Sequence, residues 1–527
     1  MGSRREFLRF MGYSASVSAL PLSPWILQCA NADRRFIKKS FQSISPSDKD
    51  DVVLAEGLKY EILIQWNDVI NSKNDKFGFN NDYLAVVPLG YSAAESLLWV
   101  NHETPNPIFV SGNTNPKKKT KEQVIAEQKA VGGSLIHLKL QNQKWDWVRN
   151  SNYNRRLDAR TQMPIISDRP IAGSQSAVGT LGNCAGGVTP WSTILTCEEN
   201  YHNFYGELDT QQNSRTASAL NWEKHFDRSP LHYGWVVEVN PLTGAAKKLT
   251  ALGRFAHEGA TPIAGKDGRC VVYMGDDANN QCLYKFISSK PGQLESGTLY
   301  VANLDEGKWV ALDHSLQPTL QKNFSDQTDV LINCRKAAQL LGGTPLARPE
   351  DVEIHPATGE VYFTQTNNKA AKNFHGQITK IREQNDDHLS LSFSSSVFVS
   401  GGEDTGLSCP DNLHFDRNGN LWVTSDISDE ELNRGPYTPF KNNGLYFIPT
   451  SGKHAGQVYQ IASAPNDAEL TGPIFSPDGN TLFLSVQHPG GMTTDINEPT
   501  SRWPSGGMPH PAVIAISGPT LDELLKS

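Results

Sequence analysis

The sequence predicts an all-β fold, a β-propeller of about six blades with a few decorating helices. The first observation is a recurring phrase in which a turn ending in glycine precedes a strand-like run, as at residues 355–364 (HPATGEVYFT). Asp-Gly, Asn-Gly and Thr-Gly turns between apolar runs are typical of β-hairpins, because glycine adopts the positive φ that such turns need. The second observation is a period, since Gly359, Gly419 and Gly479 follow one another at intervals of about sixty residues. A fixed period of short hairpins is typical of blades around a common axis.

The predicted strands follow one another along most of the chain. Weaker strand-like runs in the N-terminal half lie at residues 83–88, 97–101, 134–140 and 192–197. Hairpins are predicted at residues 239–244, 265–274, 355–364, 415–425 and 475–486. Helical patterns are few, at residues 121–130 and 331–341, and we expect them to decorate the propeller. The sequence therefore predicts one propeller domain over residues 46–520, preceded by a linker at residues 31–45.

The first thirty residues predict an export signal. Residues 3–8 (SRREFL) place paired arginines before an uncharged, weakly apolar stretch at residues 10–30. This arrangement resembles a twin-arginine signal, which a receptor reads as an address. We therefore expect the twin-arginine translocase as a partner and a periplasmic or otherwise exported protein. Cys29 follows Ile-Leu-Gln, a poor match to a lipoprotein cleavage box, and lipidation there is the weaker alternative.

Charge and composition exclude several classes of protein. The chain has 48 Lys+Arg against 56 Asp+Glu, a net charge of −8 with no dominant basic stripe, which argues against a nucleic-acid partner. No run of 18 strongly apolar residues occurs, so no membrane span is predicted. The seven cysteines include no CxxC pair and are too few for a disulfide scaffold, so most are expected as buried thiols. We expect a monomer.

Acidic residues recur at the ends of the predicted strands, where a propeller places its chemistry. An Asp or Asn there usually caps a turn, but glutamate caps poorly and is costly to bury. Carboxylates that converge on one channel mouth repel each other in a low dielectric unless cations lie between them, and Ca²⁺ prefers such oxygen ligands. The glutamates at equivalent positions are Glu199, Glu258, Glu350 and Glu469.

A cysteine among these carboxylates changes the expected metal. Cys184 opens one of the predicted strand pairs. A thiolate is a soft ligand that Ca²⁺ does not favour, and it points to a transition metal such as iron. The residues alone leave two interpretations open: a mixed-metal site, or turn and salt-bridge residues scattered around the ring.

Seven short motifs follow one another in the mature chain, after the N-terminal SRREFL. They are residues 183–187 (NCAGG), 197–199 (CEE), 253–258 (GRFAHE), 275–277 (GDD), 348–351 (RPED), 409–412 (CPDN) and 471–479 (TGPIFSPDG). In this order they resemble the PhoX-type alkaline phosphatases, which are twin-arginine-exported, iron- and calcium-dependent β-propeller enzymes. The resemblance covers about residues 50–515.

The resemblance implies hydrolysis of phosphate monoesters to release inorganic phosphate. It implies two Fe³⁺ and three Ca²⁺ ions, with a metal-held oxygen attacking phosphorus, and Arg348 gripping the substrate phosphate. The metal ligands that it implies are Cys184, Glu199, Glu258, Glu350, Asp411 and Glu469. Further candidates, for a ligand or a supporting role, are Asn80, Asn81, Asp82, Asn101, His102 and Glu103.

Two other classes of function remain open at this stage. A Ca²⁺-dependent propeller hydrolase of the lactonase or phosphotriesterase kind uses acidic and amide ligands and needs neither Cys184 nor iron. A non-catalytic propeller would hold structural Ca²⁺ with the same carboxylates. Iron content separates the phosphatase from both.

Overall fold

The computed structural model describes residues 42–90, 92–209 and 214–526. A compact unit begins at Ile44. The predicted signal at residues 1–30, Cys29 and most of the linker lie outside the described residues. The domain boundaries at residues 46 and 520 stay predictions.

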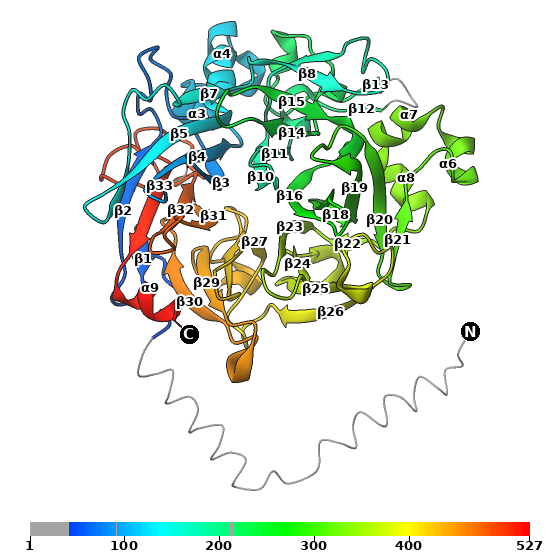
Figure 1. Ribbon diagram of the computed structural model, residues 1–527. Helices are drawn as coiled ribbons and strands as arrows, with labels where there is room; N and C mark the ends of the chain where they lie inside the picture. Colours follow the sequence, from blue (N-terminus) through cyan, green and yellow to red (C-terminus); the bar gives the residue numbers. More distant parts are fainter. Residues whose placement is uncertain (1–41, 91, 210–213, 527) are drawn as a thin grey trace, which may run out of the picture. The chain divides into compact units, whose positions relative to one another are not determined.

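Within this unit, six mostly antiparallel sheets are arranged around a central axis, which confirms the predicted propeller (Figure 1). One strand of each sheet faces the axis, and each of these inner strands contacts the inner strands of its two neighbours. In order around the ring they are β3 (Asn81–Pro88), β10 (Asn183–Val188), β16 (His257–Ala264), β23 (Pro349–Ile354), β27 (Pro410–Phe415) and β31 (Glu469–Phe475).

We number the blades 1 to 6 by these inner strands. Blade 1 adds β4 (Glu95–His102), β5 (Gly132–Gln141), β6 (Lys144–Trp147) and β7 (Arg155–Leu157). Blade 2 adds β11 (Ile194–Glu198), β14 (Val236–Val239), β15 (Ala246–Leu249), β8 (Gln162–Ile166) and β9 (Ser176–Val178). Blade 3 adds β17 (Arg269–Asp276), β19 (Leu283–Pro291), β20 (Gly297–Asn303) and β21 (Lys308–Ala311).

The remaining three blades have four or five strands. Blade 4 adds β24 (Val361–Gln365), β25 (Gln377–Glu383) and β26 (Phe393–Ser400). Blade 5 adds β28 (Leu421–Ser425), β29 (Gly444–Ile448), β30 (Tyr459–Ser463) and β1 (Val53–Leu54). Blade 6 adds β32 (Leu482–Gln487), β33 (Ala512–Ser517) and β2 (Lys59–Gln65). Two short pairs lie outside the blades: β12 (Leu208–Asp209) with β13 (Ser214–Arg215), and β18 (Asn279–Gln281) with β22 (Leu346–Ala347).

Strands from both ends of the described chain share blades 5 and 6. In blade 6, β2 pairs antiparallel with β33, so that Ile62 lies opposite Ile514. In blade 5, β1 pairs with β30. These pairings hold the ring closed, because no blade at the seam is built from one end of the chain alone.

The recurring glycine phrase is the turn between the inner strand and the second strand of a blade. Gly359, Gly419 and Gly479 fill this position in blades 4, 5 and 6, with φ of 70°, 82° and 70°. Gly268 does the same in blade 3, with φ of 84°. The period of about sixty residues is therefore the length of one blade with its connections.

The helices decorate the blades, as expected. They are α3 (Pro107–Val110), α4 (Lys121–Ala130), α5 (His202–Tyr205), α6 (Pro318–Asn323), α7 (Gln327–Ile332), α8 (Cys334–Leu340) and α9 (Pro519–Leu524). Single 3₁₀ turns lie at Pro116–Lys118, Trp222–Lys224, Pro230–His232, Thr250–Leu252, Lys369–Ala371, Gln384–Asp386, Gly435–Tyr437 and Gly452–His454. The pattern at 331–341 divides at Asn333, whose side chain donates to the carbonyl and carboxylate oxygens of Asp329. Among the described residues no helix has the length and apolar character to cross a membrane.

The apolar core lies between neighbouring blades. Leu84 and Leu98 of blade 1 pack with Phe483 and Val513 of blade 6 in one buried cluster. Blades 3 and 4 meet in the same way. Burial of about 25 cal/mol per Å² of apolar surface holds such faces together and leaves the strand ends at the channel mouth free for polar residues.

Candidate metal centre

A break in strand pairing occurs near the start of every inner strand. The register shifts after Asn81 in β3, Asn183 in β10, Glu258 in β16, Pro349 in β23, Pro410 in β27 and Thr471 in β31. A β-bulge re-aims the side chains beside it and ends regular pairing. The sequence thus builds the same local distortion six times around one end of the channel.

The residues at these breaks line a cavity of about 220 Å³. The second residue of five inner strands lines it: Asp82, Cys184, Glu258, Glu350 and Asp411. In the sixth blade the first residue, Glu469, does so. Together with Glu199 and Arg348, all seven site residues expected from the sequence line this one cavity.

A second set of side chains reaches the same cavity from the following strand of each blade. Because inner and second strands are antiparallel, the end of the second strand lies beside the start of the inner one. In five blades the residue just past the second strand lines the cavity: Glu103, Glu199, Asp277, Asp426 and His488. In blade 4 the corresponding Thr366 donates instead to the carbonyl of Pro410, at 3.1 Å.

Sequence reasoning missed part of this second set. Asp277, Asp426 and His488 line the cavity, as do Asn200 and Gln487. The signal that could have found Asp426 is positional, since it directly follows β28 as Glu199 follows β11. In isolation, the Ser-Asp at that point reads as an ordinary turn.

Of the six further candidates at residues 80–82 and 101–103, three lie at or beside the cavity and three make hydrogen bonds that support the fold. Asp82 and Glu103 line the cavity, and Asn80 donates to Glu103 at 3.4 Å. The other three have structural partners. Asn81 donates to the carbonyl of Ala512, Asn101 accepts from Trp99 Nε1, and His102 Nε2 lies 2.7 Å from Ser134 Oγ.

The thiol of Cys184 is surrounded by carboxylates. Its Sγ lies 3.1 Å from Asp82 Oδ2 and 3.0 Å from Glu258 Oε1. Cys184, Glu199 and Glu258 each offer a ligand atom, all within 4.8 Å of one another. Burial raises the pKa of the Cys184 thiol well above its ordinary value, and the neighbouring carboxylates raise it further. A bound cation would reverse this balance and hold the group as a thiolate.

The carboxylates of the cavity are buried together. Burial raises the pKa of Asp82 to about 7, and the charge of Glu103 adds to the effect. Burial likewise raises the pKa values of the carboxyls of Glu258, Glu350, Asp411 and Glu469 well above their ordinary range. These side chains therefore cannot all ionise unless positive charge is placed among them.

Several buried acceptors have no partner within the part of the chain that the structure describes. They are Asp82 Oδ1, Glu350 Oε2 and Gln487 Oε1. Buried polar atoms are otherwise almost always hydrogen-bonded, so these call for an explanation. Oxygen atoms aimed into a polar cavity are the ligands that hard cations prefer, and the donor set therefore fits a metal centre.

Arg348 is the principal cation of the cavity and is held from three sides. It donates to Asp277 at 2.8 and 3.0 Å and to Asp426 at 3.2 Å, and its Nη2 lies 2.6 Å from Glu350 Oε1. Burial opposes its charge, but the carboxylates of Asp277, Glu350 and Asp426 raise the pKa of Arg348. Its φ of 54° lies in the left-handed region that favours glycine, a strain often found at functional positions.

A second group of candidate ligands lies at the edge of the cavity. Asp429, Glu469 and His488 offer ligand atoms within 4.8 Å of one another. His488 Nε2 lies 3.4 Å from Glu469 Oε1, and its Nδ1 lies 3.6 Å from Asp429 Oδ1. Sequence reasoning did not select Asp429, which follows the second strand of blade 5 by four residues.

Fold and site together define a six-bladed propeller whose channel mouth carries a thiol- and carboxylate-lined site of the metal-binding type. Comparison with known families then identifies it more closely. Residues 39–490 match the family described as alkaline phosphatase PhoX, and the chain belongs to this family. This confirms the resemblance drawn from the seven motifs.

Among solved structures, one PhoX protein supports the same family. The chain is similar to PhoX of Pseudomonas fluorescens, solved in complex with vanadate, a transition-state analogue: 29% identity, a TM-score of 0.82, and coverage of 91% of this chain and 98% of that one. A protein of unknown function from Dyadobacter fermentans is 10% identical, with a TM-score of 0.41 over 88% of this chain and 100% of that one. A gluconolactonase from Xanthomonas campestris is 12% identical, with a TM-score of 0.31 over 84% and 97%. A comparison with the curated proteins found no match.

The family decides between the classes of function left open above. The chain is a phosphatase of a metal-dependent family, which sets aside the lactonase-like and non-catalytic alternatives. The identity of the metals and the ligand role of each residue stay predictions.

Proposed function

We propose that this chain is an exported alkaline phosphatase that hydrolyses phosphate monoesters, with iron and calcium ions held in the central cavity. One observation carries the proposal: nine carboxylates and one thiol converge with Arg348 in about 220 Å³. A phosphate dianion is repelled from such a cavity unless cations neutralise it. Binding of substrate and binding of metal are therefore inseparable here.

The ligand atoms of the cavity fall into two groups, one that includes a soft thiolate and one of hard oxygens only. Cys184, with Glu199 and Glu258 beside it, supplies the thiolate and oxygen ligands that suit iron. Glu350, Asp411 and Glu469 add oxygen ligands that suit calcium. When bound, such cations neutralise charge on the phosphate oxygens and supply a nucleophile near neutral pH.

Arg348 is the group that would hold the substrate phosphate. Asp277 and Asp426 grip its guanidinium on two edges and fix its plane. A guanidinium donor forms a strong, charge-assisted hydrogen bond to phosphate, and a donor that is already oriented loses no freedom in the transition state. The P. fluorescens protein was solved with vanadate, and the same cavity is expected to bind vanadate here.

The proposed signal, linker and catalytic domain are those that the sequence predicts. The SRREFL motif at residues 3–8 supports export through the twin-arginine route, with residues 1–30 as the signal and 31–45 as a linker. Residues 46–520 form the catalytic domain in this proposal. The protein acts as a monomer on phosphomonoesters and releases inorganic phosphate.

Paired cysteine variants test the proposal. Cys184 lines the cavity, whereas Cys270 is buried in the core cluster between blades 2 and 3 and serves as the matched control. Cys184→Ala is expected to lose iron, visible absorption and turnover of p-nitrophenyl phosphate. Cys270→Ala is expected to keep all three. Full iron content and full turnover in Cys184→Ala would overturn the assignment.

A further inference from the structure

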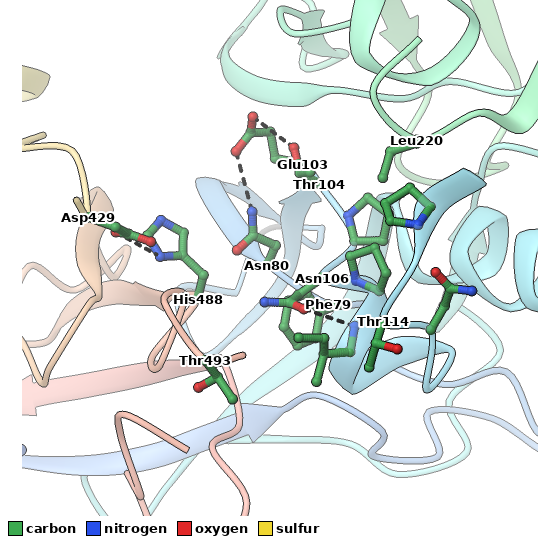
Figure 2. Close-up of a pocket in the computed structure, with 16 residues that line it drawn as sticks. Phe79, Asn80, Glu103, Thr104, Asn106, Thr114, Leu220, Asp429, His488 and Thr493 are labelled. Carbon is green, nitrogen blue, oxygen red and sulfur yellow. Dashed lines mark hydrogen bonds and ion pairs between the residues drawn. The ribbon is translucent and has the colours of Figure 1, made fainter. Parts of the chain in front are cut away.

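A second, larger cavity adjoins the metal centre. It measures about 530 Å³ and shares Glu103 and His488 with the smaller cavity (Figure 2). Figure 2 shows His488 and Asp429 on one side of it and Leu220 and Thr114 on the other. Pockets of this size hold small organic molecules.

Its lining is apolar or neutral over most of its surface. Phe79, Ile108 and Leu220 contribute apolar side chains, together with Pro105 and Pro116. Among the described residues that line it there is no lysine or arginine. The smaller cavity, by contrast, is lined almost entirely by charged and amide side chains.

The charges at the pocket's inner edge are negative or already paired. Glu103 and Asp429 are carboxylates. The imidazole of His488 lies between Asp429 and Glu469, at 3.6 and 3.4 Å. An additional anionic group placed in this pocket would meet these carboxylates and no lysine or arginine among the described lining residues, which disfavours it.

The wall of the pocket is built rigidly. Pro105 and Pro107 fix the backbone between β4 and α3, and the Asn106 side chain accepts from the amide of Ile108 at 3.0 Å. Phe79 packs edge-on against Trp66, with ring centroids 4.9 Å apart. A preformed wall binds without the cost of ordering it first.

The sizes of the two cavities suit different parts of a phosphomonoester. The smaller one has room for a phosphate group and its cations, so the organic part of a monoester must lie elsewhere. We infer that the larger pocket binds the alcohol portion of the phosphomonoester, the leaving group, and selects uncharged aromatic or apolar alcohols over alcohols that carry a further anionic group. This inference rests on the proposed function.

A charge introduced into the pocket tests the inference. Ile108 is half-buried in the pocket wall, whereas Ile62, 37% exposed on the outermost strand of blade 6, is the matched control. The kcat/KM ratio of 4-carboxyphenyl phosphate to phenyl phosphate is measured in each protein. The intrinsic reactivities of the two substrates enter this ratio equally in every protein. They therefore cancel when the ratio of one variant is compared with that of another. Ile108→Lys is expected to raise this ratio about tenfold, and Ile62→Lys to leave it within twofold of the wild type.

A second variant keeps the test decisive if Ile108→Lys does not fold. Thr114 also lines the pocket and is exposed, so Thr114→Lys carries the same charge with little packing cost. It is expected to raise the ratio severalfold. Ratios equal to that of Ile62→Lys in every folded pocket variant, with robust turnover of phenyl phosphate, would overturn this inference alone. Absence of turnover of both substrates by the metal-loaded wild type would instead overturn the proposed function.

Discussion

Replacing Arg348 by lysine removes the planar donor while keeping the positive charge. The guanidinium holds Asp277 through two nitrogens and also contacts Asp426 and Glu350. A lysine ammonium presents its donors from one point, so it cannot keep these contacts and also donate to phosphate from the same plane. The loss of one oriented transition-state donor corresponds to about 3 kcal/mol, or roughly a hundredfold in rate.

The assay is kcat/KM for p-nitrophenyl phosphate, with the inhibition constant of vanadate measured alongside. In Arg348→Lys, kcat/KM is expected to fall and the inhibition constant of vanadate to rise, each by about a hundredfold, because both report binding of the transition state. Bound metal is measured in the same samples and is expected to stay near the wild-type content, since Arg348 is not a ligand.

Arg335 supplies the matched control. It grips Asp276 through two nitrogens, as Arg348 grips Asp277, but it does not line the cavity. Arg335→Lys is expected to lower the unfolding temperature and to keep kcat/KM within about threefold of the wild type. Equal losses of kcat/KM in the two variants, or a loss below threefold in Arg348→Lys, would show that Arg348 does not hold the substrate phosphate.

Three further predictions concern the scaffold and the metals. A Cβ on Gly275 would overlap the carbonyl oxygen of Glu350, whereas a Cβ on Gly507 meets nothing within 4 Å. Gly275→Ala is therefore expected to lower metal content and thermal stability, and an equal loss in Gly507→Ala would contradict this. Burial lowers the pKa of His257 to about 3 from 6.5, so its stabilising contribution is complete above pH 6.5 and is lost as the pH falls toward 3. Between pH 6.5 and 4.5, the free energy of unfolding of the wild type, measured by chemical denaturation, is expected to fall by about 2 kcal/mol more than that of His257→Asn. That of His454→Gln, in an exposed turn, should fall in parallel with the wild type. Removal of metal by a strong chelator is expected to abolish turnover, with recovery on adding iron and calcium together; recovery with calcium alone would exclude a required iron.

The repeat structure was the part of the fold most accessible to sequence reasoning. The turn glycines Gly359, Gly419 and Gly479 need a positive φ that few other residues adopt, so their spacing is visible in a single sequence. The division of the predicted helix at Asn333 was not visible. It depends on side-chain hydrogen bonds to Asp329 that an apolar pattern does not report.

The site was predictable to the extent that unusual residue types marked it. Glutamates and a cysteine at strand starts stand out, because neither is a common turn residue. Asp426 did not stand out, and Asp277 was noted in the GDD motif without a site role, since an aspartate after a strand ordinarily caps a turn. Their place in the cavity follows from antiparallel pairing, which brings the end of each second strand to the same mouth as the start of each inner strand.

We propose that this phosphatase works with iron and calcium in the cavity around Cys184. The most direct test is metal analysis of the purified protein, with the visible spectrum and turnover of p-nitrophenyl phosphate read from the same sample. We expect iron and calcium together, an absorption band from the thiolate–iron bond, and turnover that scales with iron content across preparations. Calcium without iron in a fully active sample would exclude an iron–calcium centre.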